Sequence, residues 1–332
     1  MESLDAASRR GLTMSLFVTE SDRGTSELPR LTTTVPKEYV HRASLAEVFL
    51  TACTAQDDLR FSLSGQWPRA HTHFTSPDGT SHDPLQVAET FRQASMFLAH
   101  TELSVPLGHH FVMWDLSYTT DLCGLRIASR PTDFDIEARC TELVQRRGVI
   151  NRATVQLSMF REGVLVAHGA TQFSTITPAV YTRLRAGRPT AAASPVDGAV
   201  PDVSRQAMPP SSVNRRNADE VVLSATDHPR RWLLTPNLDH PILFDHGADH
   251  IPGMVLLEGA RQAAFAAVAS PAFVPASAST TFSQYAEFDR PCWIEVTRVS
   301  ADNDGTMTVE VVGRQDDRCV YTSTITGPVG RQ

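Results

Sequence analysis

Glu258, Arg261 and Gln262 interrupt an otherwise apolar run that extends from Met254 to Val268. Their i, i+3 and i+4 spacing places all three side chains on one face if the segment is helical. A Glu–Arg pair on a surface helix would be a common and weak structural feature. Here the flanking residues leave no solvated face, and burying an unpartnered carboxylate is costly. We therefore expect Glu258 to have a raised pKa and to work as an acid or base.

A turn precedes this predicted helix. Asp249 is an available capping acceptor, and Pro252 suits a first helical turn because its missing N–H costs little there. Gly253 removes a side chain at a place where a ligand could approach the backbone closely. The N–H groups of Gly253 and Met254 at the helix N-terminus are therefore candidates to hold an oxyanion without any side chain.

The same pattern occurs in the first half of the chain, where Glu89, Arg92 and Gln93 repeat the spacing. Two further landmarks precede both glutamates in the same order: residues 46–51 and 219–224, then residues 81–84 and 249–252, with one extra residue before the second glutamate. Landmarks that recur in one order predict an internal duplication.

The whole sequence sets limits on this duplication and on its partners. Its 332 residues allow about two domains, and a net charge of −7 argues against general nucleic-acid binding. No apolar run is long enough to span a membrane, and the N-terminus lacks the apolar core of a secretory signal. The five cysteines are scattered, which favours a reduced cytoplasm and argues against a disulfide or metal framework.

The predicted organisation has four parts: a flexible tail (residues 1–30), a first repeat (residues 31–182), a linker rich in Pro, Ala and Ser (residues 183–212) and a second repeat (residues 213–332). In each repeat a long apolar helix, at residues 85–100 and 254–269, is followed by strands with hairpin turns between them. This order predicts an α+β fold in which an antiparallel sheet wraps one central helix.

Three segments resemble the AfsA-type A-factor biosynthesis family of tandem hotdog repeats: residues 83–94 (DPLQVAETFRQA), 105–110 (VPLGHH) and 245–258 (DHGADHIPGMVLLE). The resemblance implies a double hotdog fold, in which one chain builds the pseudo-dimer that hotdog subunits otherwise form in pairs. Such a chain is expected to be a monomer or a homodimer.

The resemblance also implies an activity. A β-ketoacyl group is transferred from an acyl carrier protein to the hydroxyl of dihydroxyacetone phosphate, and ring closure with dehydration gives a butenolide phosphate. No cofactor is implied. Hotdog dehydratases carry a catalytic histidine upstream of the helix, and the nearest candidates here are His246 and His250. Their spacing to Glu258 is shorter than in a dehydratase, although dehydration or thioester hydrolysis remains an alternative, as does non-catalytic acyl or lactone binding.

The proposed chemistry assigns roles that the sequence leaves partly open. Glu258 or Glu89 is the candidate general base. Arg261 and Arg92 either pair with these carboxylates or clamp the substrate phosphate. The remaining candidates for substrate binding are listed here: Gln262, Gln93, Gly253, Met254, His250, His246 and His110.

Other polar residues are expected to be structural. His71, His73 and His82 are interpreted as loop or strand residues rather than metal ligands. Arg215, Arg216, Arg230 and Arg231 are interpreted as solvated surface, or as a basic patch on which an acidic carrier protein docks.

Overall fold

The computed structural model describes residues 32–146, 148–188 and 206–330. Within them, twelve strands form one antiparallel sheet in the order β1-β2-β4-β5-β6-β3-β9-β12-β11-β10-β8-β7. The strands of the first half are β1 (Leu50–Asp57), β2 (Arg60–Trp67), β3 (His110–Thr120), β4 (Thr132–Arg146), β5 (Val149–Arg161) and β6 (Val164–Ile176). Those of the second half are β7 (Leu223–Ser224), β8 (Arg231–Leu234), β9 (Ser277–Phe282), β10 (Trp293–Ala301), β11 (Thr306–Gln315) and β12 (Arg318–Pro328).

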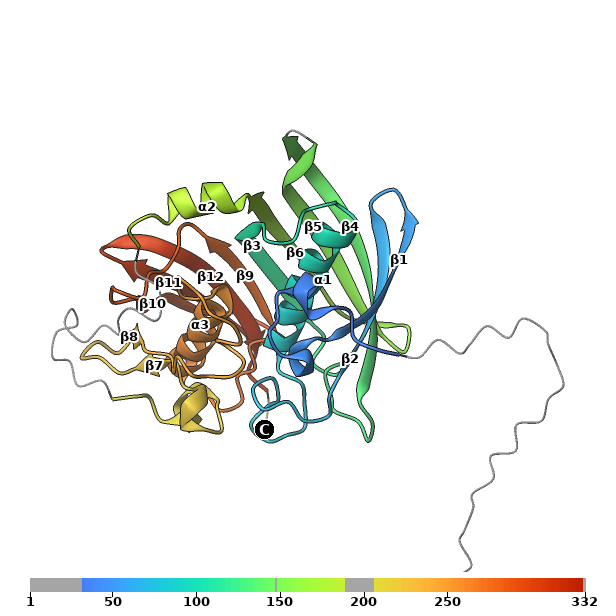
Figure 1. Cartoon of the computed structure of the whole chain (residues 1–332). Helices are drawn as coiled ribbons and strands as arrows, with labels where there is room; N and C mark the ends of the chain where they lie inside the picture. The colour runs from blue at the N-terminus through green and yellow to red at the C-terminus, as the bar shows by residue number, and fades with distance from the viewer. Residues whose placement is uncertain (1–31, 147, 189–205, 331–332) are drawn as a thin grey trace, which may run out of the picture. The chain divides into compact units, whose positions relative to one another are not determined.

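The two halves of the sheet join where β3 pairs with β9, with Leu116 opposite Thr280. The helix α1 (Pro84–Thr101) packs on the first half, and α3 (Gly253–Val268) packs on the second (Figure 1). This arrangement confirms the double hotdog fold, because each half wraps one apolar helix and a single chain supplies both halves.

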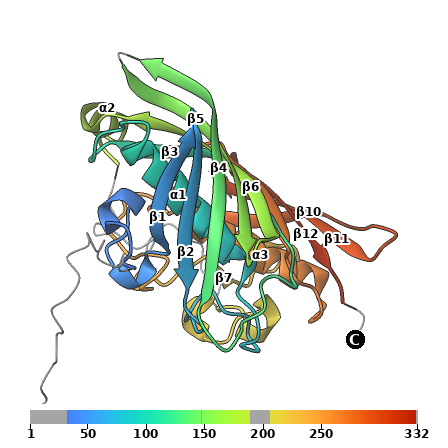
Figure 2. The same ribbon diagram turned by 90° about the vertical axis from the view of Figure 1, so that its right-hand side faces the viewer.

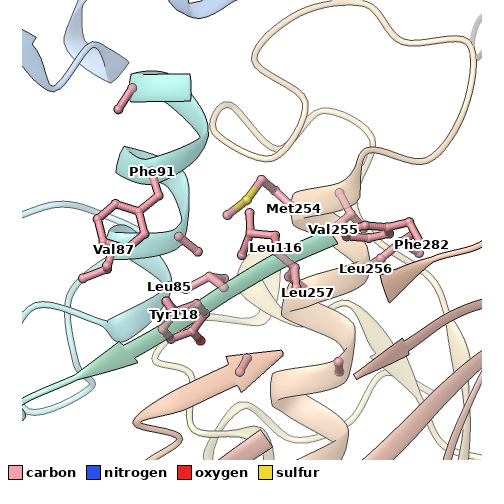
Figure 3. Close-up of a cluster of buried hydrophobic side chains, with 14 of the residues drawn as sticks. Leu85, Val87, Phe91, Leu116, Tyr118, Met254, Val255, Leu256, Leu257 and Phe282 are labelled. Carbon is pink, nitrogen blue, oxygen red and sulfur yellow. The ribbon is translucent and has the colours of Figure 1, made fainter. Parts of the chain in front are cut away.

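Apolar side chains fill the space between α1 and α3, as Figure 3 shows. Leu116 of β3 lies between the helices beside Met254 and Leu257, and Phe91 of α1 is completely buried. Burying a side chain of this size contributes about 1.5–3 kcal/mol, so this cluster holds the two halves together.

The two long helices begin differently. Asp83 caps α1, because its Oδ1 accepts a hydrogen bond from the N–H of Leu85 at 2.9 Å. The N-cap of α3 is Pro252, which offers no side-chain acceptor. The prediction that Asp249 caps this helix is wrong, since its carboxylate has other partners. The separation from N-cap to glutamate is the same in both helices, so the extra residue inferred from the sequence is not present in the structure.

Both ends of the predicted linker belong to the packed structure, whereas residues 189–205 and the predicted tail, residues 1–30, lie outside the described residues. The short helix α2 (Pro178–Leu184) runs into the predicted linker, and Arg185 behind it is buried. At the other end the N–H of Met208 donates to Leu223 O at 2.9 Å. In the described part of the chain no helix has the length and apolar character needed to cross a membrane.

Four short 3₁₀ helices complete the described elements: η1 (Lys37–Val40), η2 (Leu45–Glu47), η4 (Pro210–Val213) and η5 (Ala218–Glu220). In the first half η1 and η2 precede β1, and in the second half η4 and η5 precede β7. By this order η1 is equivalent to η4, and η2 is equivalent to η5.

Candidate active site

The carboxylates of Glu258 and Glu89 are completely buried, and each is bound by two arginines. Arg261 donates through Nε to Oε2 of Glu258 at 3.0 Å, as its helical spacing predicts. Arg215 donates to both oxygens of the same carboxylate, with its Nε 2.7 Å from Oε1. The first repeat has the same arrangement, in which Arg92 and Arg42 bind Glu89.

The expectation of raised pKa values at the glutamates is wrong. Burial alone raises the pKa of Glu89, but the charges of Arg42 and Arg92 outweigh it and lower the pKa to about 2. Burial also opposes ionisation of Glu258, and Arg215 and Arg261 bring its pKa well below the usual value. Both carboxylates are therefore anions at neutral pH, but the lowered pKa values make them weak bases and arginines occupy their oxygens, which argues against a general-base role.

Sequence reasoning missed the roles of Arg42 and Arg215 at the buried glutamates. Arg215 is only 4% exposed, which corrects its interpretation as solvated surface. Each arginine follows a residue in the left-handed conformation, His41 (φ 53°) or Asn214 (φ 56°), which turns the chain inward after a 3₁₀ helix. The repeat held a usable signal, because both arginines precede the matched segments, residues 46–51 and 219–224, by the same distance.

These arginines also connect the two repeats. Arg42 donates from Nη1 to Ile242 O of the second repeat at 3.1 Å. Arg215 donates from Nη1 to His73 O of the first repeat at 2.9 Å, and to the Asp83 carboxylate at 3.3 Å. Each buried glutamate is thus the centre of a charged cluster that crosses the interface between the repeats.

The glutamines of the pattern are engaged with the backbone. Gln262 donates from Nε2 to Glu220 O at 2.7 Å and accepts from the N–H of Val222 at 3.0 Å. Gln93 makes the equivalent bonds with Glu47 O and the N–H of Phe49. These amides tie each helix to the start of its own half of the sheet.

The N-terminus of α3 presents free backbone donors. Among the described residues the N–H groups of Gly253 and Met254 have no acceptor, and the first helical bond runs from Val255 to Pro252 O. A Cβ atom added at Gly253 would make only ordinary contact with the Phe282 ring, at 3.6 Å. Packing within the chain therefore does not require a glycine here, and Gly253 is exposed.

An Asp–His pair lies directly before this N-terminus. His250 Nδ1 is 2.7 Å from Asp249 Oδ1, and the Tyr181 hydroxyl donates to the same oxygen at 2.6 Å. Burial raises the pKa of Asp249, but hydrogen bonds from His250 and Tyr181 and the charge of Arg185 lower it well below the usual value. An ionised Asp249 can only accept, so the proton in this hydrogen bond belongs to Nδ1 of His250 and the bond leaves Nε2 unengaged.

Aromatic contacts surround this pair. His110 stacks on Tyr181 with the ring centroids 3.6 Å apart, and His250 contacts the Tyr285 ring edge-on at 4.6 Å. Arg185 lies over the Tyr285 ring and donates to Asp249 and to Glu287. Tyr181 and Arg185 were not identified from the sequence, since Tyr181 lies at the end of the predicted first repeat and Arg185 lies in the predicted linker.

Two histidines, His41 and His100, form a hydrogen-bonded pair nearby. His100 Nδ1 is 2.8 Å from the carbonyl of Val105, so it must carry the proton. His100 Nε2 is then an acceptor, and His41 Nε2, at 2.9 Å, is the donor. Burial and then the charges of Arg92 and the neighbouring histidines, His246 and His110 among them, lower the pKa of His41 to about 3.

Most of the predicted histidines therefore gather at one end of the interface, although His246 has a half-exposed side chain. Burial lowers the pKa of His110, and the charge of Asp249 opposes this effect because the two groups are close. The histidines between β2 and α1 are not among those gathered there: His71, His73 and His82 lie along the segment that leads into α1. Within the described residues no cluster of His, Cys, Asp or Glu has a geometry that could hold a metal ion.

The N-terminus of α1 borders a cleft of about 390 Å³, lined among others by Asp83, Pro84, Asn214 and Arg261. Pro84 has no N–H, and the Asp83 carboxylate accepts the N–H of Leu85. The N-terminus of α1 thus carries the Asp83 carboxylate, whereas the equivalent N-terminus of α3 carries unpaired N–H groups among the described residues.

Comparison with known proteins agrees with the duplicated fold. A model of the A-factor biosynthesis hotdog domain matches residues 24–177 and again residues 199–329. A 2-oxo-3-(phosphooxy)propyl 3-oxoalkanoate synthase from Streptomyces virginiae is 41% identical, over 89% of this chain and 98% of its own. A protein of the same name from Streptomyces coelicolor is 37% identical over 89% and 91%. A solved structure assigned as an oleoyl thioesterase from Lactobacillus plantarum has a TM-score of 0.50 at 10% identity, covering 82% and 97%, and shares the fold.

Proposed function

Since this chain belongs to the AfsA family of A-factor biosynthesis hotdog proteins, we propose that it joins the acyl group of a 3-oxoacyl thioester to the hydroxyl of dihydroxyacetone phosphate. The product, a 2-oxo-3-(phosphooxy)propyl 3-oxoalkanoate, is the ester of these two components. Its ring closure and loss of water would give a butenolide phosphate.

The observation that carries this proposal is a base beside unpaired donors at the N-terminus of α3. His250, oriented by Asp249 at 2.7 Å, takes the proton from the attacking hydroxyl on Nε2. The hydroxyl oxygen then attacks the thioester carbonyl. The N–H groups of Gly253 and Met254 stabilise the oxyanion of the tetrahedral intermediate. When the C–S bond breaks, the proton on His250 passes to the leaving sulfur.

Arg92 and His246 are our candidates for the phosphate of the acceptor. Arg92 donates from Nη1 to the Met96 sulfur at 2.9 Å, and a thioether is a weak acceptor that a phosphate oxygen would replace. His246 is half exposed and close enough to Arg92 for that cation to add to the effect of burial in lowering its pKa.

Glu89 and Glu258 are positioning residues in this proposal. Each holds two arginines of its own repeat, and one of them, Arg42 or Arg215, donates to a backbone carbonyl of the other repeat. The bond from Arg42 to Ile242 O links α1 to the turn before α3. The groups proposed for chemistry all belong to one chain, so a single chain suffices to build the site. We place the reaction in the cytoplasm, with an acyl carrier protein as the donor of the thioester.

The assay incubates the protein with a 3-oxoacyl thioester and dihydroxyacetone phosphate and follows products by mass spectrometry. We expect an ester that contains both components and its dehydrated cyclic form. Release of the free 3-oxo acid alone would identify a thioesterase. Loss of water without coupling would identify a dehydratase, and saturable binding without turnover would identify a binding protein.

A further inference from the structure

The short helix α2 has two different faces. Tyr181 and Arg185 point inward, where they bind Asp249 beside the candidate base. Val180, Arg183 and Leu184 share the opposite face at i, i+3 and i+4 spacing. We call these three residues the α2 patch.

The α2 patch is exposed and combines aliphatic with cationic side chains. Val180 is 38% exposed and Leu184 is 57% exposed, although both are large hydrophobic residues. Among the described residues no acidic group forms a salt bridge with Arg183. Arg188 follows it on a half-exposed side chain and is itself paired with Glu287, with Nε 3.8 Å from Oε1. The chain as a whole has a net charge of −7, so this local cationic site stands out from its surroundings.

The position of α2 connects the patch to the candidate site. Figures 1 and 2 show α2 at the end of the sheet where β6 ends, and there His110 at the start of β3 pairs with Ile176. The Tyr181 ring stacks on His110 from the inner side of the helix. A partner bound to the outer side would therefore lie at the edge of the Asp249–His250 site.

We propose that the α2 patch is the docking surface for the acidic carrier protein that delivers the 3-oxoacyl thioester, which rests on the proposed function. A carrier protein presents its acyl group on a long flexible arm, and negative side chains surround the attachment point. Arg183 complements that charge, while Val180 and Leu184 supply the apolar centre of a small interface.

The second repeat offers no equivalent of α2 in the described part of the chain, where β12 ends at Pro328. The pseudo-symmetry of the fold is thus broken on the same side on which the base and the free N–H groups occur. One docking surface would serve one site in each chain.

The test compares two acyl donors in steady-state kinetics. One donor is a 3-oxoacyl group on purified acyl carrier protein, and the other is the same acyl group on free pantetheine. For Arg183→Glu and Leu184→Glu we expect KM for the carrier-bound donor to rise by about tenfold or more. KM and kcat for the pantetheine thioester should stay at the wild-type values, which also shows that the variants are folded.

Val164→Glu is the matched control, because Val164 is an aliphatic residue with 62% exposure at the start of β6, at the opposite end of that strand from α2. It should leave both donors unaffected. Unchanged kinetics for carrier-bound donor in both α2 variants would overturn the docking surface, as would an equal loss with both donors, which indicates a structural effect.

Direct binding of the carrier protein, measured by titration calorimetry, separates this inference from the proposed function. Carrier binding that is lost in Arg183→Glu supports the docking surface even if wild-type protein makes no ester. Ester formation from free pantetheine thioester by a protein that binds no carrier would support the function and reject the docking surface.

Discussion

The N-termini of α1 and α3 are equivalent places in a duplicated fold, yet they present opposite chemistry. At α1 the cap is Asp83 and the first helical residue is Pro84, so a carboxylate occupies the place and one N–H is missing. At α3 the cap is Pro252 and the first helical residue is Gly253, which leaves two donors unpaired among the described residues. An oxyanion would be repelled at the first and stabilised at the second.

Other features are the same in both repeats. Both have a buried Glu between two arginines and a Gln bound to the backbone, and these parts hold the helices in place. The parts that differ lie in the turns before the helices and in α2. We infer that duplication preserved the supporting structure twice and the chemistry once.

Replacing His250 tests this comparison most severely. His250→Asn keeps a donor for Asp249 but removes the base, so we expect kcat to fall by about 10²–10⁴-fold. Ser81 occupies the same position relative to the N-cap of α1, and Ser81→Ala should retain wild-type kcat. Steady-state assays with the pantetheine thioester compare the two. Similar losses in both variants would contradict a single working site.

Glu258→Gln tests the shared supporting structure. Arg215 and Arg261 would be left buried without their counter-charge, so we expect a loss of about 3–5 kcal/mol in the free energy of unfolding. The control is Glu295→Gln, since Glu295 also lies between two arginines but on the sheet surface, where a loss of about 0–1 kcal/mol is expected. Urea denaturation measures both. Equal losses of unfolding free energy in the two variants would show that burial does not increase the cost of removing the carboxylate charge.

Gly253→Pro converts the start of α3 into that of α1. The preceding residue has ψ 145°, which suits a following proline, so the helix should form normally while one oxyanion donor is lost. We expect kcat to fall by about 10²–10³-fold with little change in the melting temperature. The reverse change, Pro84→Gly, should not alter kcat. Full activity in Gly253→Pro would rule out this N–H as a donor.

The acid stability of the chain should reflect both buried carboxylates. Their pKa values are lower in the folded than in the unfolded protein, so their stabilising contribution is complete above the usual value of 4.5. As the pH falls from there towards about 2, the pKa of folded Glu89, protonation of the unfolded chain is favoured and this contribution is lost. Melting temperatures recorded down this range should decrease steadily. A flat profile would show that the carboxylates are not ionised in the folded protein.

Local pattern in the sequence was sufficient for several features. The apolar run around Glu258 predicted the helix and the shared face with Arg261, because i, i+3 and i+4 spacing is a property of any helix. The recurrence at Glu89 and Arg92 predicted the duplicated fold. Pro252 and Gly253 indicated an open N-terminus for α3, which needs no long-range information.

The state of the glutamates was decided only by tertiary structure. Arg215 lies 43 residues before Glu258, and Arg42 lies 47 residues before Glu89. Nothing in the local pattern indicates that these distant cations reach the carboxylates. Burial without them would raise the pKa, whereas burial with them lowers it, so the sign of the shift depends on the folded arrangement.

The sequence by itself thus determined the two helices, their wrapping sheet and the polar face that each helix carries, since these follow from the order of neighbouring residues. Tertiary structure decided which groups meet at the candidate site. Tyr181 is separated by 68 residues from Asp249, and the bond between them orients the His250 pair. Such contacts arise because the sheet continues through both repeats and brings the end of the first beside the turn that opens α3.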